Sequence, residues 1–415
     1  MVHMRVLHII ARLNVGGTAR YVGRLAQDLP QHGVEAIVAT GYVQGMEAED
    51  PIVRDLPVER IPHLGRQINV PDDKRARAEI RSVIDSIRPD ILHTHTFKAG
   101  VLGRSFRLQI PVVHTFHGHL LDDPDFVGPK AAAITQVERA LARRTSRIVT
   151  VGDKVGRDLL RKGVGRPDQY VPIVPGVDPL RLPSRKSARS ELSLADDSIV
   201  VAWVARVTEV KGPARALELA RKFPDVSFIL AGGGNLLPHI SESAPPNVRV
   251  VGWYSAATIY AAADIALSTS YNEGMPVSLI EAQLAGLPVV GNDVGSVREV
   301  VADGETGFVG TPNQSKALLE ILLRDPALRK KMASRAKSRA MRMFAPSRMV
   351  SAHASEADQL WSPTQMLRTE TSTQTLYIRF TLSPLSTPLV SNTGVLQDSS
   401  RSTSSNECCW SKTAT

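Results

Sequence analysis

The chain has 415 residues, of which 43% are hydrophobic and 22% charged, as expected for a globular protein with sizeable cores. This length favours two domains over one. No run approaches the roughly 18 consecutive apolar residues of a membrane-spanning helix. The opening residues are too few for a signal peptide and alternate like a strand, so we expect a cytoplasmic protein.

The formal net charge is +9, and the excess is concentrated in segments 139–189 and 324–348. Two interpretations have similar weight: solvated helix faces, or attraction to phosphate-bearing ligands and anionic membrane surfaces. Nucleic acid is not expected as a partner, because no binding motif accompanies these segments. The only cysteines, Cys408 and Cys409, are adjacent and predict neither a disulfide framework nor a zinc site.

The first half of the chain alternates short β-branched runs with helical patterns. A helix is expected over 19–29, ended by Gly33. The expected strands are 5–11, 35–39, 91–95, 111–116, 147–151 and 170–174. Strands alternating with helices predict parallel βαβ units and an α/β fold.

The segment from Pro172 to Pro183 contains four prolines and indicates a turn-rich linker. A second α/β pattern follows it. Its expected strands are 199–205, 227–231, 248–251, 265–268 and 287–290. Beyond Trp361 the composition becomes rich in Ser and Thr with little apolar periodicity, which predicts a disordered tail over 362–415.

A glycine-rich turn, Asn14-Val-Gly-Gly-Thr18, follows the first expected strand. Gly16 and Gly17 would let the backbone approach a ligand, and the next helix would offer free N–H groups to a phosphate. A plain tight turn is an equal alternative. The turn is not GxGxxG, and no acidic residue follows in the right setting for the ribose of NAD, so a nicotinamide dehydrogenase is disfavoured.

Two cations, Arg206 and Lys211, follow the first strand of the second half. Open α/β sheets bind ligands at the carboxyl ends of their strands, where these cations would neutralise a departing diphosphate. The alternative is two exposed loop charges.

The segment from Glu273 to Glu281 is the most informative part of the second half. Pro276 favours the start of a helix and Gly286 its end, so the preceding loop would present free N–H groups to an anion. Glu273 in that loop could accept hydrogen bonds from sugar hydroxyls. Glu281 lies about two turns into the helix and could reach a ribose. A structural salt bridge is the alternative for Glu281.

A metal site is a weaker hypothesis. Five histidines invite it: His93, His95, His114, His117 and His119. His93 and His95 would share one strand face, but no Cys or Glu-x-x-His pattern supports a metal. Asp123-Pro-Asp125 formally matches the DxD of metal-dependent transferases, yet a flexible acidic loop is the favoured interpretation. We therefore expect no metal and no cofactor.

Together the motifs resemble the retaining glycosyltransferases of family 4, over about 5–344 of the chain. The residues that carry the resemblance are Gly16-Gly17…His32-Gly33, Arg206 with Lys211-Gly, Glu273-Gly-Met-Pro…Glu281-Ala, Gly286-Leu-Pro-Val-Val and Asp303-Gly-Glu-Thr-Gly-Phe. The resemblance implies a GT-B fold, with two Rossmann-like domains whose parallel sheets face across a cleft. The acceptor-side domain would span 1–180 and the donor domain 181–345, and 346–361 could form a helix returning to the first domain.

The resemblance also implies roles for single residues. Arg206 and Lys211 would hold the donor diphosphate. Glu273, the Gly274–Met275 backbone and Pro276 would hold the donor sugar, Glu281 the ribose, and Gly16 and Gly17 the phosphates from the first domain. His117 matches a position that contacts the sugar near the reacting carbon, which makes His117, Glu273, Arg206 and Lys211 the catalytic candidates. Pro175 before Gly176 departs from the Asn of many relatives.

The implied activity is transfer of a sugar from a nucleotide diphosphate sugar, the substrate, with retained configuration, front-face attack and no required metal. The basic segments favour a lipid-linked or otherwise anionic acceptor at the inner membrane face, as in bacterial surface-polysaccharide assembly. Two alternatives stay open: a non-catalytic nucleotide-sugar-binding protein of the same fold, and a nucleotide-sugar epimerase.

Overall fold

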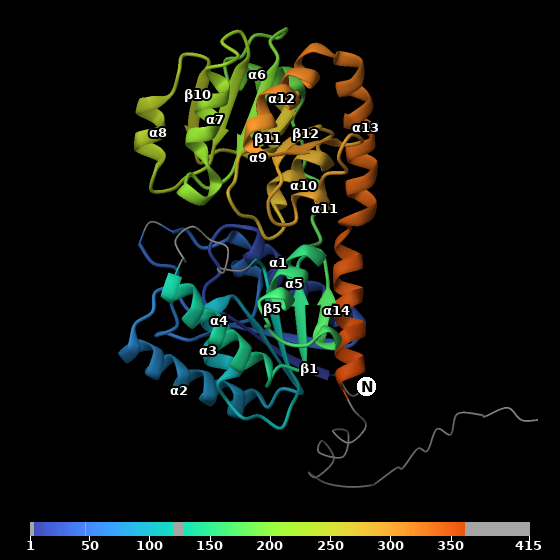
Figure 1. Ribbon diagram of the computed structural model, residues 1–415. Helices are drawn as coiled ribbons and strands as arrows, with labels where there is room; N and C mark the ends of the chain where they lie inside the picture. Colours follow the sequence, from blue (N-terminus) through green and yellow to red (C-terminus); the bar gives the residue numbers. More distant parts are fainter. Residues whose placement is uncertain (1–3, 46, 119–127, 362–415) are drawn as a thin grey trace, which may run out of the picture. The chain divides into compact units, whose positions relative to one another are not determined.

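The computed structural model describes residues 4–45, 47–118 and 128–361, and its strands form two parallel sheets (Figure 1). One sheet has seven strands in the order β3-β2-β1-β4-β5-β6-β7, and the other has six in the order β10-β9-β8-β11-β12-β13. In each sheet the strand that comes first in the sequence, β1 or β8, lies in the interior, and later strands are added on both sides of it. This is the doubly wound arrangement of Rossmann-like domains. The predicted α/β class with two such domains is confirmed.

The first sheet is built from every strand expected in the first half plus one more. Its strands are β1 (Met4–Ile10), β2 (Val34–Thr40), β3 (Val58–Arg60), β4 (Ile91–His95), β5 (Val112–Phe116), β6 (Arg147–Thr150) and β7 (Tyr170–Pro172). The helices that accompany it are α1 (Gly17–Asp28), α2 (Val70–Ile87), α3 (Phe97–Arg104), α4 (Gly128–Ala142) and α5 (Asp153–Arg161). A short 3₁₀ helix, η1 (Leu29–His32), ends at Gly33, whose φ of 77° is left-handed.

Alternating residues of β1 belong to two different cores. Val6 and Ile10 pack in the cluster that includes α1, whereas Leu7 and Ile9 pack in the cluster that includes α2. Because side chains alternate along a strand, the two helices must cover opposite faces of the sheet. His8 shares the face of Val6 and Ile10, so it points toward the α1 side.

The second sheet contains β8 (Val200–Val204), β9 (Ser227–Ala231), β10 (Val248–Gly252), β11 (Ile265–Ser268), β12 (Val289–Asn292) and β13 (Gly307–Gly310). The helices of this half are α6 (Arg185–Glu191), α7 (Pro213–Ala220), α8 (Leu237–Ser243), α9 (Ala256–Ala262), α10 (Val277–Leu284), α11 (Val297–Val300), α12 (Ser315–Arg324) and α13 (Pro326–Met343). The strand expected over 287–290 begins two residues later, because Pro288 has no N–H to donate to a ladder.

Helix α10 has the limits that its sequence predicts. Pro276 is the capping residue immediately before the helix, and Gly286 follows its last turn with a left-handed φ of 83°. Proline has no N–H to leave unpaired at a helix start, and glycine adopts the left-handed conformation without steric penalty. The amides at the start of α10 therefore lie at the end of the 269–275 loop.

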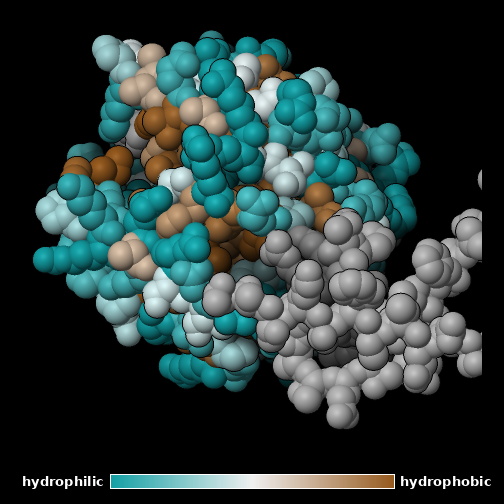
Figure 2. All heavy atoms as spheres, turned by 90° about the horizontal axis from the view of Figure 1, so that it is seen from below, coloured by the Kyte–Doolittle hydropathy of each residue, from teal (hydrophilic) through white to brown (hydrophobic). Residues whose placement is uncertain are grey.

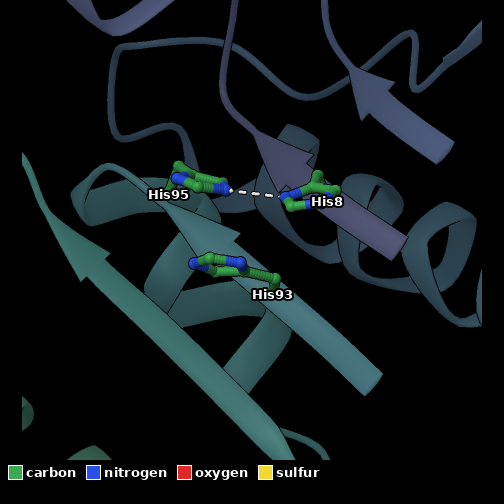
Figure 3. Close-up of side chains that lie close together, drawn as sticks. All are labelled: His8, His93 and His95. Carbon is green, nitrogen blue, oxygen red and sulfur yellow. Dashed lines mark hydrogen bonds between the residues drawn. The ribbon is translucent and has the colours of Figure 1, made fainter. Parts of the chain in front are cut away.

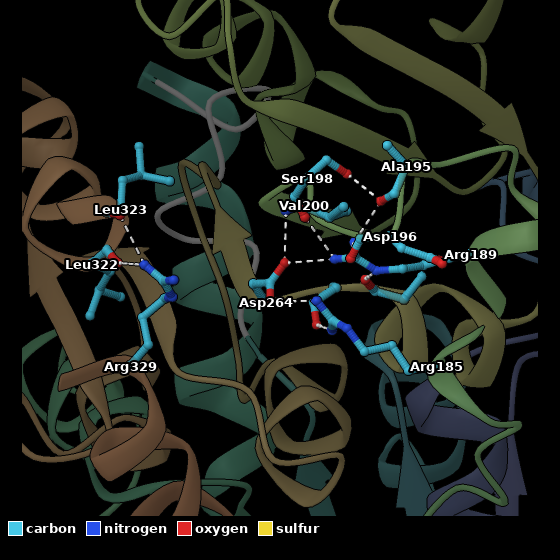
Figure 4. Close-up of polar contacts among 12 residues, drawn as sticks. Arg185, Arg189, Ala195, Asp196, Ser198, Val200, Asp264, Leu322, Leu323 and Arg329 are labelled. Carbon is cyan, nitrogen blue, oxygen red and sulfur yellow. Dashed lines mark hydrogen bonds and ion pairs between the residues drawn. The ribbon is translucent and has the colours of Figure 1, made fainter. Parts of the chain in front are cut away.

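A buried arginine fastens α6 to the second sheet (Figure 4). Arg189 is 1% exposed and donates to the carbonyls of Ala195, Asp196 and Ser198 at 2.7–2.8 Å. It also pairs with Asp264 at 3.0 Å, and the same carboxylate accepts from Arg185 at the surface. Five donors meeting a ring of carbonyls and one carboxylate leave this cation fully satisfied.

The last described helix, α14 (Pro346–Leu360), contacts α1 and η1 of the first half, next to β1 in Figure 1. Its His353 meets Tyr21 of α1, with 2.6 Å between Nε2 and the hydroxyl oxygen. Among the described residues, no helix combines the length and apolarity needed to cross a membrane. The face seen from below is largely hydrophilic, with apolar side chains in separate patches (Figure 2).

Candidate active site

The cations and carboxylate singled out in the second half come together beyond the ends of β8 and β11. Lys211 Nζ lies 2.7 Å from Glu273 Oε2, and Ser270 Oγ donates to Glu273 Oε1 at 2.7 Å. Both oxygens of Glu273 are therefore held, one by a full positive charge. This pairing fixes the direction of the carboxylate and places an ammonium group beside the loop that precedes α10.

Arg206 follows β8, and its side chain makes no hydrogen bond or ion pair with the residues that the structure describes, although its carbonyl accepts from the Thr208 amide at 2.9 Å. The residue is exposed, yet desolvation by its surroundings lowers the pKa of its guanidinium; the charges of Arg66 and Arg12 lower it further, while those of Glu273 and Glu47 raise it. Arg12 itself is paired with Glu47. An exposed arginine that has cations and carboxylates around it but no side-chain ion pair of its own can receive an anion.

The loop before α10 touches the end of β5 closely. A Cβ added at Gly274 would lie 2.1 Å from the carbonyl oxygen of His117 and 2.9 Å from Gly118 Cα. Gly118 itself has a left-handed φ of 134°. No residue with a side chain fits at 274 without moving backbone, so glycine is required for this approach.

The N-termini of α1 and α10 also converge. A Cβ at Gly17 would lie 2.7 Å from Val277 Cγ2, so the first residue of each helix meets the other. Each helix start carries free amides and a partial positive charge. Two such ends that meet give an environment suited to a multiply charged anion such as a diphosphate, although Asp50 already accepts from the Gly16 amide at 3.4 Å.

Glu281 is buried inside α10 and pairs with a residue that the sequence did not indicate. Its Oε1 accepts from Arg20 Nη1 of α1 at 2.7 Å, and Arg20 Nε lies 3.8 Å from Asp50. Burial raises the pKa of Glu281, while the charge and hydrogen bond of Arg20 oppose that rise. The salt-bridge alternative is thus realised, yet Oε2 makes no hydrogen bond with a described residue and can still accept one.

His117 lies at the end of β5 with its Nε2 atom 3.1 Å from His95 Nδ1. Tyr21 packs edge-on against its ring, with 4.9 Å between ring centres and an interplanar angle of 89°. Burial lowers the pKa of His117 to about 3, so the imidazole is neutral at physiological pH. A neutral ring can exchange hydrogen bonds with sugar hydroxyls without carrying charge.

Three buried histidines, His8, His93 and His95, have ring nitrogens within 4.8 Å of one another (Figure 3). They are the group that could hold a metal ion among the described residues. However, the His93 and His95 rings stack at 4.2 Å and 27°, and His8 Nδ1 faces His95 Nε2 at 3.1 Å. Stacked rings aim their lone pairs along nearly parallel planes, whereas metal ligands converge on one point, so a hydrogen-bonded network fits better.

His114 does not belong to this group. Its Nδ1 lies 2.8 Å from Thr94 Oγ1 on the opposite face of the sheet, near Gly100 and Arg104 of α3. Several other predicted features lie outside the described residues: His119, Asp123, Asp125, Cys408, Cys409 and the tail 362–415.

Sequence reasoning missed further contacts that join distant parts of the chain. Glu299 of α11 accepts from the backbone amides of Asp153 and Lys154 at 2.8 and 2.7 Å, which caps α5. Gly176 lies against α14, where a Cβ would be 2.5 Å from Pro346 Cα. Pro175, which stands where many relatives carry Asn, therefore precedes the residue at which the linker meets α14. Neither contact has a local sequence signal, because the partners are more than 140 residues apart.

Two family models match the chain: Glycosyltransferase Family 4 over residues 15–181 and Glycosyl transferases group 1 over 184–339. D-inositol 3-phosphate glycosyltransferase of Mycobacterium tuberculosis is 29% identical in an alignment 328 residues long that covers 71% of this chain and 68% of that protein. Sucrose-phosphate synthase of Thermosynechococcus elongatus has a TM-score of 0.76 at 19% identity, covering 86% of this chain and 99% of that one. Anabaena HepE, solved with UDP and glucose, has a TM-score of 0.73 at 22% identity, covering 86% and 100%. The chain thus has the GT-B fold and belongs to the group 1 glycosyltransferases.

Proposed function

We propose that the chain transfers a sugar from a nucleotide diphosphate sugar to an acceptor, with retained configuration and without a required metal. The observation that carries the proposal is the pairing of Lys211 with Glu273 beside an unpaired Arg206. This set offers two cations to a diphosphate and a fixed carboxylate to sugar hydroxyls. UDP is the nucleotide we favour, because the fold relative HepE was solved with UDP and glucose.

The leaving diphosphate would be stabilised by the protein itself. Arg206 and Lys211 supply full charges, and the N-termini of α1 and α10 supply amides and dipole ends. In other transferases a divalent cation neutralises the same developing charge. Here fixed cations would do this work in a site already arranged for it.

The nucleoside would be anchored by Glu281. Its Oε1 is occupied by Arg20, but Oε2 can accept a ribose hydroxyl while that ion pair stays intact. Arg20 would then hold the carboxylate in position and would offset part of its burial. The same contact ties α1 to α10 on both sides of the phosphate region.

Retention requires attack on the face from which the diphosphate departs, or a covalent intermediate. Glu273 is a poor nucleophile because Lys211 and Ser270 hold its two oxygens. We therefore favour front-face attack: the anomeric C–O bond to the diphosphate breaks and the bond to the acceptor oxygen forms. The acceptor proton passes to an oxygen of the leaving phosphate, so charge and atoms balance.

The acceptor we propose is anionic, such as a lipid-linked glycan precursor at the inner membrane face. Its support is the charge distribution: the cluster of Arg12, Arg66 and Arg206 adds to the basic segments of the sequence. The relative from Mycobacterium tuberculosis is likewise named for a phosphorylated acceptor. Equal activity on neutral soluble sugars and on phosphate-bearing acceptors would contradict this part of the proposal.

The test is thermal stabilisation by UDP, GDP and ADP. Ligand at about 100 times its dissociation constant adds about 2.7 kcal/mol to the free energy of unfolding. We expect one nucleotide to stabilise the wild type and the surface control Lys222→Ala, and to lose most of its effect in Lys211→Ala. No stabilisation by any nucleotide would contradict the proposed donor site, whereas stabilisation without transfer to any acceptor would favour the non-catalytic nucleotide-sugar-binding protein. Donor consumption without acceptor would instead indicate an epimerase or hydrolase.

A further inference from the structure

A line of three imidazoles leads from His117 into the first domain. His117 Nε2 lies 3.1 Å from His95 Nδ1, and His95 Nε2 lies 3.1 Å from His8 Nδ1. The second of these contacts is drawn in Figure 3. His8 and His95 are almost fully buried, at 1% and 0% exposure. The strand register explains the line, because β1 and β4 pair His8 with His93 and place His95 two residues further on the same face.

The number of ring protons allows the three histidines only two combinations of tautomers. Burial lowers the pKa of His8 and His117 to about 3 and that of His95 well below its usual value, so each ring carries one N–H. His95 must donate one hydrogen bond and accept the other. The protons therefore point all toward His117 or all toward His8, and the tautomer of His8 dictates that of His117.

The far end of the line distinguishes these states. His8 Nε2 is buried and has no hydrogen-bond partner among the described residues. His8 also lines a cavity of about 20 Å³ whose other lining residues are mostly apolar, so a water molecule there would find few hydrogen-bond partners. A bare acceptor nitrogen is tolerated in such a place more readily than an orphaned N–H. The favoured state has the His8 proton on Nδ1, donated to His95.

We propose that His8 and His95 are positioning residues that hold the proton of His117 on Nδ1, so that His117 presents a hydrogen-bond donor to the donor sugar. The sugar contact rests on the proposed function; the tautomer does not. In this state His95 donates from Nδ1 to His117 Nε2. His117 Nδ1 makes no hydrogen bond with a described residue, so its proton is available to a sugar hydroxyl. Neither positioning residue touches the substrate.

The direct test is an NMR measurement of tautomers. Long-range proton–nitrogen correlation spectra of protein with isotope-labelled histidine show which ring nitrogen is protonated, and His117→Gln assigns the His117 signal. We expect His117 protonated on Nδ1 in the wild type and a mixture of tautomers in His8→Leu. A wild-type His117 protonated on Nε2 would overturn the proposal, as would an unchanged tautomer in His8→Leu.

Kinetics provides the second readout. His8→Leu should lower kcat about 10-fold, as expected for one misdirected hydrogen bond in a water-poor site, with the KM for donor changed less than about 2-fold. His93→Leu is the matched control: it is equally buried, stacks on His95 and lies outside the line, so kcat and the His117 tautomer should persist. An equal fall of kcat in both variants would indicate a merely structural effect and count against the proposal.

The conservative variant His8→Asn separates loss of the hydrogen bond from loss of the fold. Its amide can donate to His95 in place of Nδ1 and should restore the His117 tautomer and most of kcat. If it folds with a mixed tautomer, the proposal is wrong. The spectra need no turnover, so a protein that shows the expected tautomer but no transfer would refute the proposed function and leave this inference standing.

Discussion

Substitution of Arg20 by alanine isolates the ion pair between α1 and α10. Arg20 Nη1 lies 2.7 Å from Glu281, whose side chain is 8% exposed, and Asp50 is a more distant second partner at 3.8 Å. Removing the guanidinium leaves a buried carboxylate without its donor. The variant therefore tests how strongly this contact stabilises the fold before any ligand is present.

The expected magnitude lies between two limits. Breaking a fully buried pair destabilises by about 3–5 kcal/mol, whereas exposed pairs contribute about 0–1 kcal/mol. The Arg20 side chain is 54% exposed, so water screens its half of the interaction. We expect Arg20→Ala to lose about 2 kcal/mol at neutral pH, which lowers the melting temperature by roughly 4–8 °C for a domain of this size.

The stability that Arg20→Ala loses should depend on pH, because Glu281 can be protonated. Burial raises the pKa of Glu281, so the folded protein holds this proton at a higher pH than the unfolded chain does. Stability therefore falls as pH rises from the unfolded value through the folded value. Arg20 opposes that rise, so removing it extends the window upward. The loss should be larger near about pH 8 than near about pH 5, because acidification protonates Glu281 and removes the charge that Arg20 neutralises.

The assay is thermal unfolding of wild type and variant at both pH values. Arg24→Ala is the matched control, because Arg24 lies on the same helix and its carboxylate partners, Asp28 and Asp178, are more exposed than Glu281. It should change stability by less than about 1 kcal/mol at either pH. Glu281→Gln should abolish the pH-dependent part. The same loss for Arg20→Ala at both pH values would refute the reasoning, because it would show that Glu281 does not titrate in this window.

Three further predictions concern a close backbone contact, a buried arginine and a helix cap. Gly274→Ala places a Cβ 2.1 Å from the carbonyl oxygen of His117, so backbone must move, and the change should lower both the melting temperature and kcat/KM, the latter about 100-fold; normal kinetics would show that the contact is dispensable. Arg189→Met should lose about 3–5 kcal/mol in urea unfolding, against less than about 1 for Arg185→Ala, and similar losses would contradict the role assigned to burial. Glu299→Ala should speed hydrogen exchange of the first two amides of α5 and lower stability by about 1 kcal/mol.

Much of the fold could be predicted from the sequence because most strands are buried and β-branched. The strands missed were β3 (Val58–Arg60) and β13 (Gly307–Gly310), both at sheet edges and too short to show an alternating pattern. Glycines at both ends of β13 further weaken its strand signal. The start of β12 was misplaced because the apolar run begins before Pro288, which cannot join the ladder.

The site was predictable where its chemistry is local. Lys211 and Glu273 were indicated separately, and the structure places them in contact, while their roles toward a donor stay predictions. His8 escaped notice because its closeness to His95 depends on the register of β1 against β4, which no single strand encodes. The partner of Glu281 was hidden for a similar reason, since Arg20 lies 261 residues earlier.

The contact of α14 with the first half has a consequence for synthesis on the ribosome. Apolar residues of α14, including Met349 and Val350, share a core cluster with β1 and α1. At about 5–20 residues per second, roughly 20–70 seconds separate the emergence of β1 from that of α14. During that time the nascent first sheet keeps one apolar flank uncovered. This flank would be a binding site for chaperones, and completion of the first domain would await the last helix.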